Sequence, residues 1–188
     1  MSMDNSPGSR SEVRERSHAP QGNSDFLRSE ACERSYVASA GWEHPEWNGG
    51  FYPDDLPPEW RLAYYAHIYP GVYLSRAAWS DCDLQTLSGW VDDTPAHFRF
   101  VLEANPGGND DADRARLQVL APRIGLVLES PGRQDGRVLW LEGEPDLKKL
   151  AKSLQELAAS PGPIYLVSLD ANLETMNRAA ILLEVMGL

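Results

Sequence analysis

The hydrophobic and polar positions of this chain change period repeatedly, from short alternating or continuous apolar runs to longer stretches with helical spacing. The short runs predict six strands, at 36–40, 71–76, 97–104, 124–129, 138–142 and 164–169. Stretches with apolar residues three and four apart predict helices, at about 58–69, 80–91, 113–120, 146–159 and 172–186. This alternation of strands and helices indicates an α/β fold around a mostly parallel sheet.

The pattern also predicts local details at two helices and one loop. Trp60, Tyr64 and Ile68 recur every four residues and would form the apolar face of the helix over 58–69. Ser80, followed by an acidic residue three positions later, is expected to cap the next helix. The acidic run 109–113 lacks the glycine and final glutamate of a calcium loop, so we expect it to be solvated.

The first part of the chain has a different composition from the rest. Residues 1–34 are rich in Ser, Arg, Glu, Asn and Gly, and their large apolar residues are few: Val13, Phe26 and Leu27. Such a segment buries too little surface to offset its ordering entropy, so 1–34 is predicted to be a disordered polar tail. Residues 35–188 are predicted to form a single α/β domain.

Charge and motifs exclude several classes of function. The chain has 17 basic and 28 acidic residues, a net charge of −11, which disfavours nucleic acid as a partner. Its two cysteines form no zinc pattern, and no phosphate-cradling or dinucleotide motif occurs, so we expect no metal and no cofactor. No apolar run approaches the roughly 20 residues of a membrane span, and no signal-peptide core is present, so we expect a cytoplasmic protein without membrane contact.

An aromatic-rich opening resembles a known family. The matching motifs are Gly41-Trp42, Trp47, Phe51-Tyr52-Pro53, Leu56-Pro57, Trp60, Tyr64-Tyr65-Ala66, Trp90, Thr94-Pro95 and Phe98-Arg99-Phe100. This region is similar to the YecE-like proteins, domain of unknown function 72, and weaker similarity continues over residues 36–188. The resemblance implies a TIM-barrel-like fold, whose complete form needs about 250 residues.

Residues 35–188 are too few for eight strand–helix units. We therefore expect a barrel reduced to about six units by an internal deletion, which the resemblance places between Pro131 and Arg137. How the shortened sheet ends is open: it closes as a smaller barrel or keeps two edges. A truncated barrel exposes apolar flanks, so a homodimer or another protein partner is expected to cover them.

The resemblance also implies that the polar barrel-mouth residues of the family have been replaced. Our alignment puts other residues at these positions: Tyr73, Ser75, Glu103, Glu129, Trp140, Glu142, Val167 and Ser168. The first interpretation is therefore a non-catalytic binding or interaction module that has lost the family's site.

Two groups of candidate functional residues remain. Carboxylates at strand ends could bind a metal or transfer protons, or could simply cap helices: Glu103, Glu129 and Glu142, with Asp170 as a fourth. An aromatic group could line a small-molecule cleft or plug the core, and we expect its ligand-binding residues to be Trp42, His44, Trp47, Tyr52, Tyr73 and Trp140. The alternative function is a metal-assisted or acid–base hydrolase that uses His44 with the strand-end carboxylates.

Overall fold

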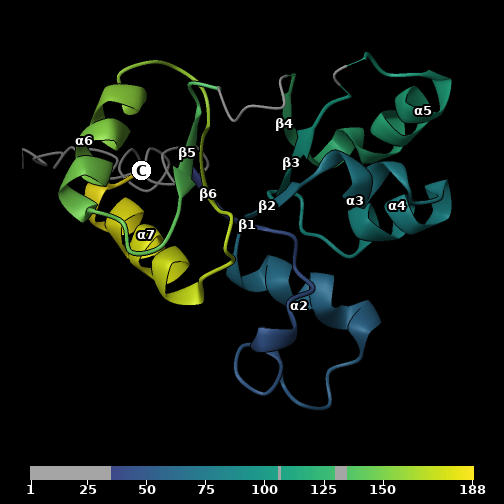
Figure 1. Ribbon diagram of the computed structural model, residues 1–188, viewed down its shortest axis with the longest axis horizontal. Coiled ribbons are helices and arrows are strands. Elements are labelled where there is room, and N and C mark those ends of the chain that lie inside the picture. Colours follow the sequence, from purple (N-terminus) through teal and green to yellow (C-terminus); the bar gives the residue numbers. More distant parts are fainter. Residues whose placement is uncertain (1–34, 106, 130–134) are drawn as a thin grey trace, which may run out of the picture.

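The computed structural model describes residues 35–105, 107–129 and 135–188, and in this part of the chain six strands form one parallel sheet. The strands are β1 (Ser35–Ala40), β2 (Gly71–Leu74), β3 (Arg99–Glu103), β4 (Ile124–Leu128), β5 (Val138–Leu141) and β6 (Ile164–Ser168). Their spatial order is β4-β3-β2-β1-β6-β5, with every neighbouring pair parallel. The sheet curls into an open half-barrel with helices outside it (Figure 1). The predicted TIM-barrel-like fold of about six units is confirmed.

Helices connect most of the strands. The α-helices are α2 (Arg61–Ile68), α3 (Arg76–Ser80), α4 (Leu84–Asp92), α5 (Asp111–Leu120), α6 (Leu147–Ala158) and α7 (Leu173–Met186). Three short 3₁₀ turns are η1 (Pro45–Trp47), η2 (Pro58–Trp60) and η3 (Ala121–Arg123). In the described part of the chain, no helix combines the length and apolar character needed to cross a bilayer.

The half-barrel has two edges because one connection is short. Only nine residues, 129–137, separate β4 from β5. A parallel crossover that carries a helix needs about a dozen or more residues, so β5 cannot follow β4 as its parallel neighbour. Instead β5 pairs with β6, at the far end of the sheet. The expected place of the deletion, between Pro131 and Arg137, falls largely in the segment 130–134. This segment and the predicted tail 1–34 lie outside the described residues.

The two faces of the sheet have different cores. Helices cover the convex face, where Val72, Phe100 and Leu166 belong to one hydrophobic cluster with buried helical side chains such as Leu87 and Leu154. The concave face has a smaller cluster made from the strands themselves, with Tyr36, Ala38, Tyr73, Val101, Leu126, Leu128, Val138, Trp140, Tyr165 and Val167. Because side chains alternate between faces along a strand, each strand supplies both cores.

Aromatic side chains cross the concave face. The Tyr73 ring of β2 meets the Trp140 ring of β5 edge-on, with centroids 5.3 Å apart. Tyr165 extends from β6 to Gly125 of β4, where an added Cβ would overlap the tyrosine hydroxyl. Gly125 is also the extra residue at a register shift between β3 and β4. Close approach of two elements thus requires glycine at this position.

Three of the local predictions are wrong. Trp60 and Ile68 are 64% and 48% exposed, whereas Leu62 and Tyr65 are buried, because the 3₁₀ turn η2 precedes α2 and changes the residue period. Ser80 ends α3 and does not cap α4. Asp83 is the cap instead, and its carboxylate accepts a hydrogen bond from the backbone N–H of Thr86 at 2.7 Å.

The third correction concerns the acidic run 109–113, which is not wholly solvated. Asp110 caps α5, and Asp113 lies on the inner side of that helix with 2% of its surface exposed. The helix therefore begins at Asp111, two residues earlier than the sequence pattern indicated.

Candidate functional site

A cleft of about 500 Å³ lies between the segment after β1, the start of α2, and the α3–α4 region. Its lining residues are Ala40, Gly41, Trp42, Glu43, His44, Pro58, Glu59, Leu62, Leu74, Ala78, Cys82, Thr86, Trp90 and Asp93. Small-molecule sites generally measure roughly 300–1,000 Å³ and combine apolar walls with a few polar groups. This cleft has the size and the composition of such a site.

Two tryptophans build one wall of the cleft, and backbone hydrogen bonds hold the segment that carries the first of them. The Trp42 ring meets the Trp90 ring edge-on, with centroids 4.9 Å apart. The Trp42 carbonyl accepts a hydrogen bond from the Tyr52 hydroxyl at 2.6 Å. Gly41, just before it, has a φ of +79°, and its N–H donates to the Tyr73 carbonyl at 2.9 Å. This left-handed conformation favours glycine, so the turn that presents Trp42 is specified locally.

The charged groups of the lining are carboxylates. Glu43, Glu59 and Asp93 are exposed at the cleft, and no Lys or Arg belongs to its lining. No basic side chain among the described residues forms an ion pair with any of the three. The cleft therefore presents uncompensated negative charge beside an aromatic wall.

His44 is the one lining residue of the described chain that carries an imidazole. Its ring packs on Trp47 with centroids 4.3 Å apart, and its Nδ1 lies 3.7 Å from the Glu46 carboxylate. Its Nε2 is buried, and no hydrogen-bond partner for it exists in the described chain. A buried ring nitrogen without a partner is costly, because it has lost its hydrogen bonds to water.

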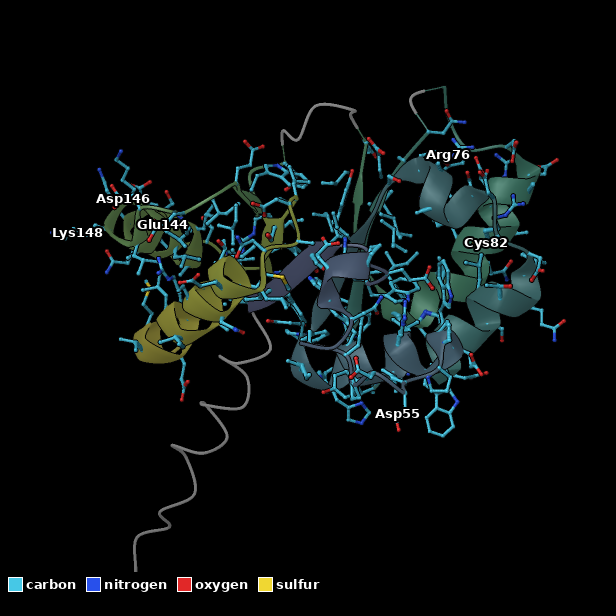
Figure 2. All side chains as sticks on the ribbon, turned by 60° about the horizontal axis from the view of Figure 1, so that its bottom comes forward. Asp55, Arg76, Cys82, Glu144, Asp146 and Lys148 are labelled. Atoms are coloured by element: carbon cyan, nitrogen blue, oxygen red, sulfur yellow. The ribbon has the colours of Figure 1, made fainter. Side chains whose placement is uncertain are left out.

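Cys82 forms part of the cleft wall on the α3–α4 side (Figure 2). Its Sγ lies 3.4 Å from the Ala78 carbonyl, and the guanidinium of Arg116 donates to the Cys82 carbonyl at 2.8 Å. Burial raises the pKa of the thiol, and the nearby carboxylates of Asp83 and Asp81 raise it further. A raised pKa leaves less of the reactive thiolate at neutral pH, so Cys82 is expected to react slowly with electrophiles.

The structure divides the predicted aromatic ligand residues among three places. Trp42 and His44 line the cleft. Trp47 and Tyr52 are buried in the core: the Trp47 indole donates to the Ala171 carbonyl at 3.1 Å. The remaining two, Tyr73 and Trp140, contact each other on the concave face. Sequence reasoning missed the walls contributed by α2 and α4, because their residues come together only in the folded chain.

The strand-end carboxylates do not converge. Glu103 accepts a hydrogen bond from the backbone N–H of Arg76 at 3.0 Å, at the start of α3, which is the capping role left open by the sequence. Glu129 and Glu142 are exposed after β4 and β5, at opposite edges of the sheet. Within residues 35–105, 107–129 and 135–188, no three His, Cys, Asp or Glu side chains are grouped to hold a metal ion.

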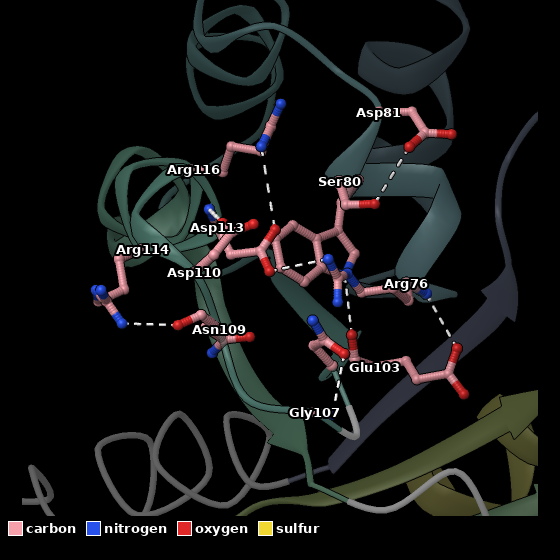
Figure 3. Close-up of polar contacts among 12 residues, drawn as sticks. Arg76, Ser80, Asp81, Glu103, Gly107, Asn109, Asp110, Asp113, Arg114 and Arg116 are labelled. Carbon is pink, nitrogen blue, oxygen red and sulfur yellow. Dashed lines mark hydrogen bonds and ion pairs between the residues drawn. The ribbon is translucent and has the colours of Figure 1, made fainter.

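A buried ion pair that the sequence did not indicate connects α3 to α5. The Asp113 carboxylate lies 2.9 Å from Nη2 of Arg76 and 4.0 Å from Nη1 of Arg116 (Figure 3). Arg76 also lies over the Trp79 ring, 5.6 Å from its centroid. Arg116 also donates a hydrogen bond to the Cys82 carbonyl, so the contacts of Asp113 with Arg76 and Arg116 help to fix the α3–α4 wall of the cleft.

Asp170, the fourth strand-end carboxylate, is expected to give a small pH-dependent contribution to stability. Burial opposes its ionisation, but hydrogen bonds from the Ser168 hydroxyl and the N–H groups of Gly143 and Asn172 outweigh burial and lower its pKa. A lowered pKa stabilises the fold above the unfolded-state value and is lost as the pH falls through the folded-state value. Asp170→Asn should therefore lower the free energy of unfolding at pH 7 by less than about 1 kcal/mol, because the group is exposed, and this difference should become smaller at about pH 3, below the unfolded-state pKa of an aspartate. Urea unfolding at both pH values measures it; an equal difference at both would contradict the assignment.

The strand order, the outer helices and the curl define the protein as a TIM-barrel-like α/β half-barrel. The family model described as "Protein of unknown function DUF72" matches residues 36–166, and the chain belongs to this family. The resemblance seen in the aromatic opening of the sequence is thereby confirmed. No curated protein matches the chain.

Two solved structures are similar to this chain. A DUF72 family protein from Thermotoga maritima MSB8 has a TM-score of 0.53 and 14% sequence identity, over 79% of this chain and 99% of that chain. A DUF72 family protein from Enterococcus faecalis V583 has a TM-score of 0.35 and 15% identity, over 80% of this chain and 57% of that chain. At such identity the Thermotoga structure supports the fold alone.

Proposed function

We propose that this DUF72 chain is a non-catalytic binding module that takes a small molecule in the cleft between α2, α3 and α4. The observation that carries the proposal is the cleft itself, with about 500 Å³ of space behind a wall of two tryptophans. Its floor includes the buried side chains of Leu62 and Leu74, which offer apolar contact to a ring or an alkyl group.

Anchoring of the cleft walls supports the binding of a ligand. The Gly41 turn and the Tyr52–Trp42 hydrogen bond hold the side of the cleft after β1, and the Arg116–Cys82 hydrogen bond holds the α3–α4 side. Preformed sites lose little conformational entropy when a ligand enters. The alternative hydrolase would pair His44 with the strand-end carboxylates. Glu103 instead accepts a hydrogen bond at the start of α3, and Glu103, Glu129 and Glu142 do not belong to the cleft lining.

Cys82 provides a direct test of whether the cleft takes a small molecule. In a Cys32→Ser chain, Cys82 is the remaining thiol, and its reaction with N-ethylmaleimide can be followed by mass spectrometry. Indole, a neutral aromatic probe, is expected to slow this reaction severalfold at millimolar concentration and to raise the melting temperature, because it binds only the folded cleft. An unchanged reaction rate and melting temperature would contradict the proposed function.

A pair of neighbouring variants controls the experiment. Thr86 and Gln85 are both exposed on α4, but only Thr86 lines the cleft. Thr86→Trp should fill the cleft and abolish the effect of indole, whereas Gln85→Trp should leave it intact. Equal behaviour of the two variants would show that indole acts elsewhere.

Association with a second copy, expected from the sequence, remains a prediction.

A further inference from the structure

We infer that the cleft selects an organic cation: an ammonium group attached to a small apolar ring. This inference rests on the proposed function, since it names the chemical class of the ligand for the same cleft. The first support is charge. Three exposed carboxylates, Glu43, Glu59 and Asp93, belong to the lining, and no Lys or Arg does.

These carboxylates come from separate elements of the chain, so it is the fold that brings them together around the cleft. Glu43 follows β1, Glu59 lies in η2, and Asp93 follows α4. None of the three forms an ion pair within the described residues, so their charge stays available to a ligand. A ligand anion would meet three like charges and pay for their repulsion, whereas a cation would relieve it.

The aromatic wall adds a second preference for a cation. Trp42 and Trp90 both line the cleft, and tryptophan is the side chain that attracts ammonium groups best through its π-system. The same rings, with Leu62 and Leu74, also provide the apolar surface that a ring on the ligand would cover. The carboxylates of the lining therefore suit the ammonium group of the ligand, and the tryptophans suit its apolar ring.

Three probes of nearly equal shape test the inference: benzylammonium, benzyl alcohol and benzoate. Their affinities can be measured by protection of Cys82 in the Cys32→Ser chain and by calorimetry. We expect benzylammonium to bind about tenfold more tightly than benzyl alcohol, as the sum of modest contributions from exposed carboxylates, and benzoate to bind most weakly. Raising the salt concentration from about 0.02 M to 0.5 M should weaken binding of the cation and leave the alcohol unchanged.

Variants separate the cleft charges from the overall charge of the chain. Glu59→Gln and Asp93→Asn should each lower the preference for benzylammonium over benzyl alcohol, and together they should nearly remove it. Asp55→Asn changes the net charge equally but lies on the loop before α2, outside the lining, and should leave the preference intact (Figure 2). Loss of the preference in Asp55→Asn would overturn the inference, because the acidic chain as a whole would then attract the cation.

The outcomes distinguish this inference from the proposed function. Equal binding of the three probes, or tightest binding of benzoate, would overturn the choice of a cation and leave a ligand cleft. If none of the probes protects Cys82 and indole also fails, the proposed function is wrong as well. Protection by benzylammonium that persists in Thr86→Trp would place the cation outside the cleft and overturn the inference.

Discussion

Replacing Gly125 by alanine is expected to lower the free energy of unfolding by about 3 kcal/mol and the melting temperature by roughly 8 °C. The added Cβ would overlap the Tyr165 hydroxyl and lie 2.9 Å from the Cβ of Arg99. Tyr165 is 1% exposed and its ring stacks on Tyr36, so it has little room to withdraw. The substitution thus acts where β6 meets β4 across the concave face. Thermal and urea unfolding measure the loss.

A second change tests the cause of that loss. Tyr165→Phe removes the overlapping hydroxyl, so the double variant Gly125→Ala/Tyr165→Phe should recover part of the stability, and the two changes should be non-additive. Recovery is expected to be partial because the contact with Arg99 remains. Gly89→Ala is the matched control: nothing lies within 4 Å of an added Cβ there, and alanine in the helix α4 should be neutral or stabilising by about 1 kcal/mol. A parent-like melting temperature for Gly125→Ala would show that β4 and β6 are not in contact.

The substitution Tyr65→Phe is expected to cost about 3 kcal/mol, although it removes a single oxygen atom. Tyr65 is fully buried, and its hydroxyl donates to the Gly71 carbonyl at 2.7 Å and accepts from the backbone N–H of Ser39 at 3.0 Å. The same oxygen lies 3.0 Å from the Ser39 hydroxyl. The hydroxyl of Tyr65 on α2 therefore bridges β1 and β2. Its loss leaves the backbone N–H of Ser39 and the carbonyl of Gly71 buried without this partner.

The neighbouring tyrosine provides the control for this prediction. Tyr64 is half-buried, its ring contacts Phe51 and Tyr52, and no hydrogen bond of its hydroxyl occurs in the described chain. Tyr64→Phe should therefore change the free energy of unfolding by less than about 0.5 kcal/mol. Urea unfolding of both variants in the same buffer measures the difference. Similar stability of the two would mean that the Tyr65 hydroxyl does not hold β1 and β2 together.

The sequence alone determined the order and kind of most elements. Period-two and continuous apolar runs are local properties, and the strand positions that they predict agree with the structure to within a few residues. The motif that opens with Gly41-Trp42 was sufficient to identify the family. The length of residues 35–188 was sufficient to predict a barrel with fewer than eight strand–helix units. These features depend on spacing along the chain, which the sequence states directly.

Only the tertiary structure decided where side chains of similar type end up. Trp42 lines a cleft, Trp47 is buried and Trp60 is exposed, although all three belong to one aromatic segment. Asp113 lies among arginines in the interior, whereas the sequence favoured solvent for its acidic run. The cleft itself needs residues from β1 to α4, brought together by the parallel pairing of β1 and β2 and by the packing of α2 and α4 on them. Such placements follow from non-local contacts and from the curl of the sheet, and neither leaves a period or a spacing in the sequence.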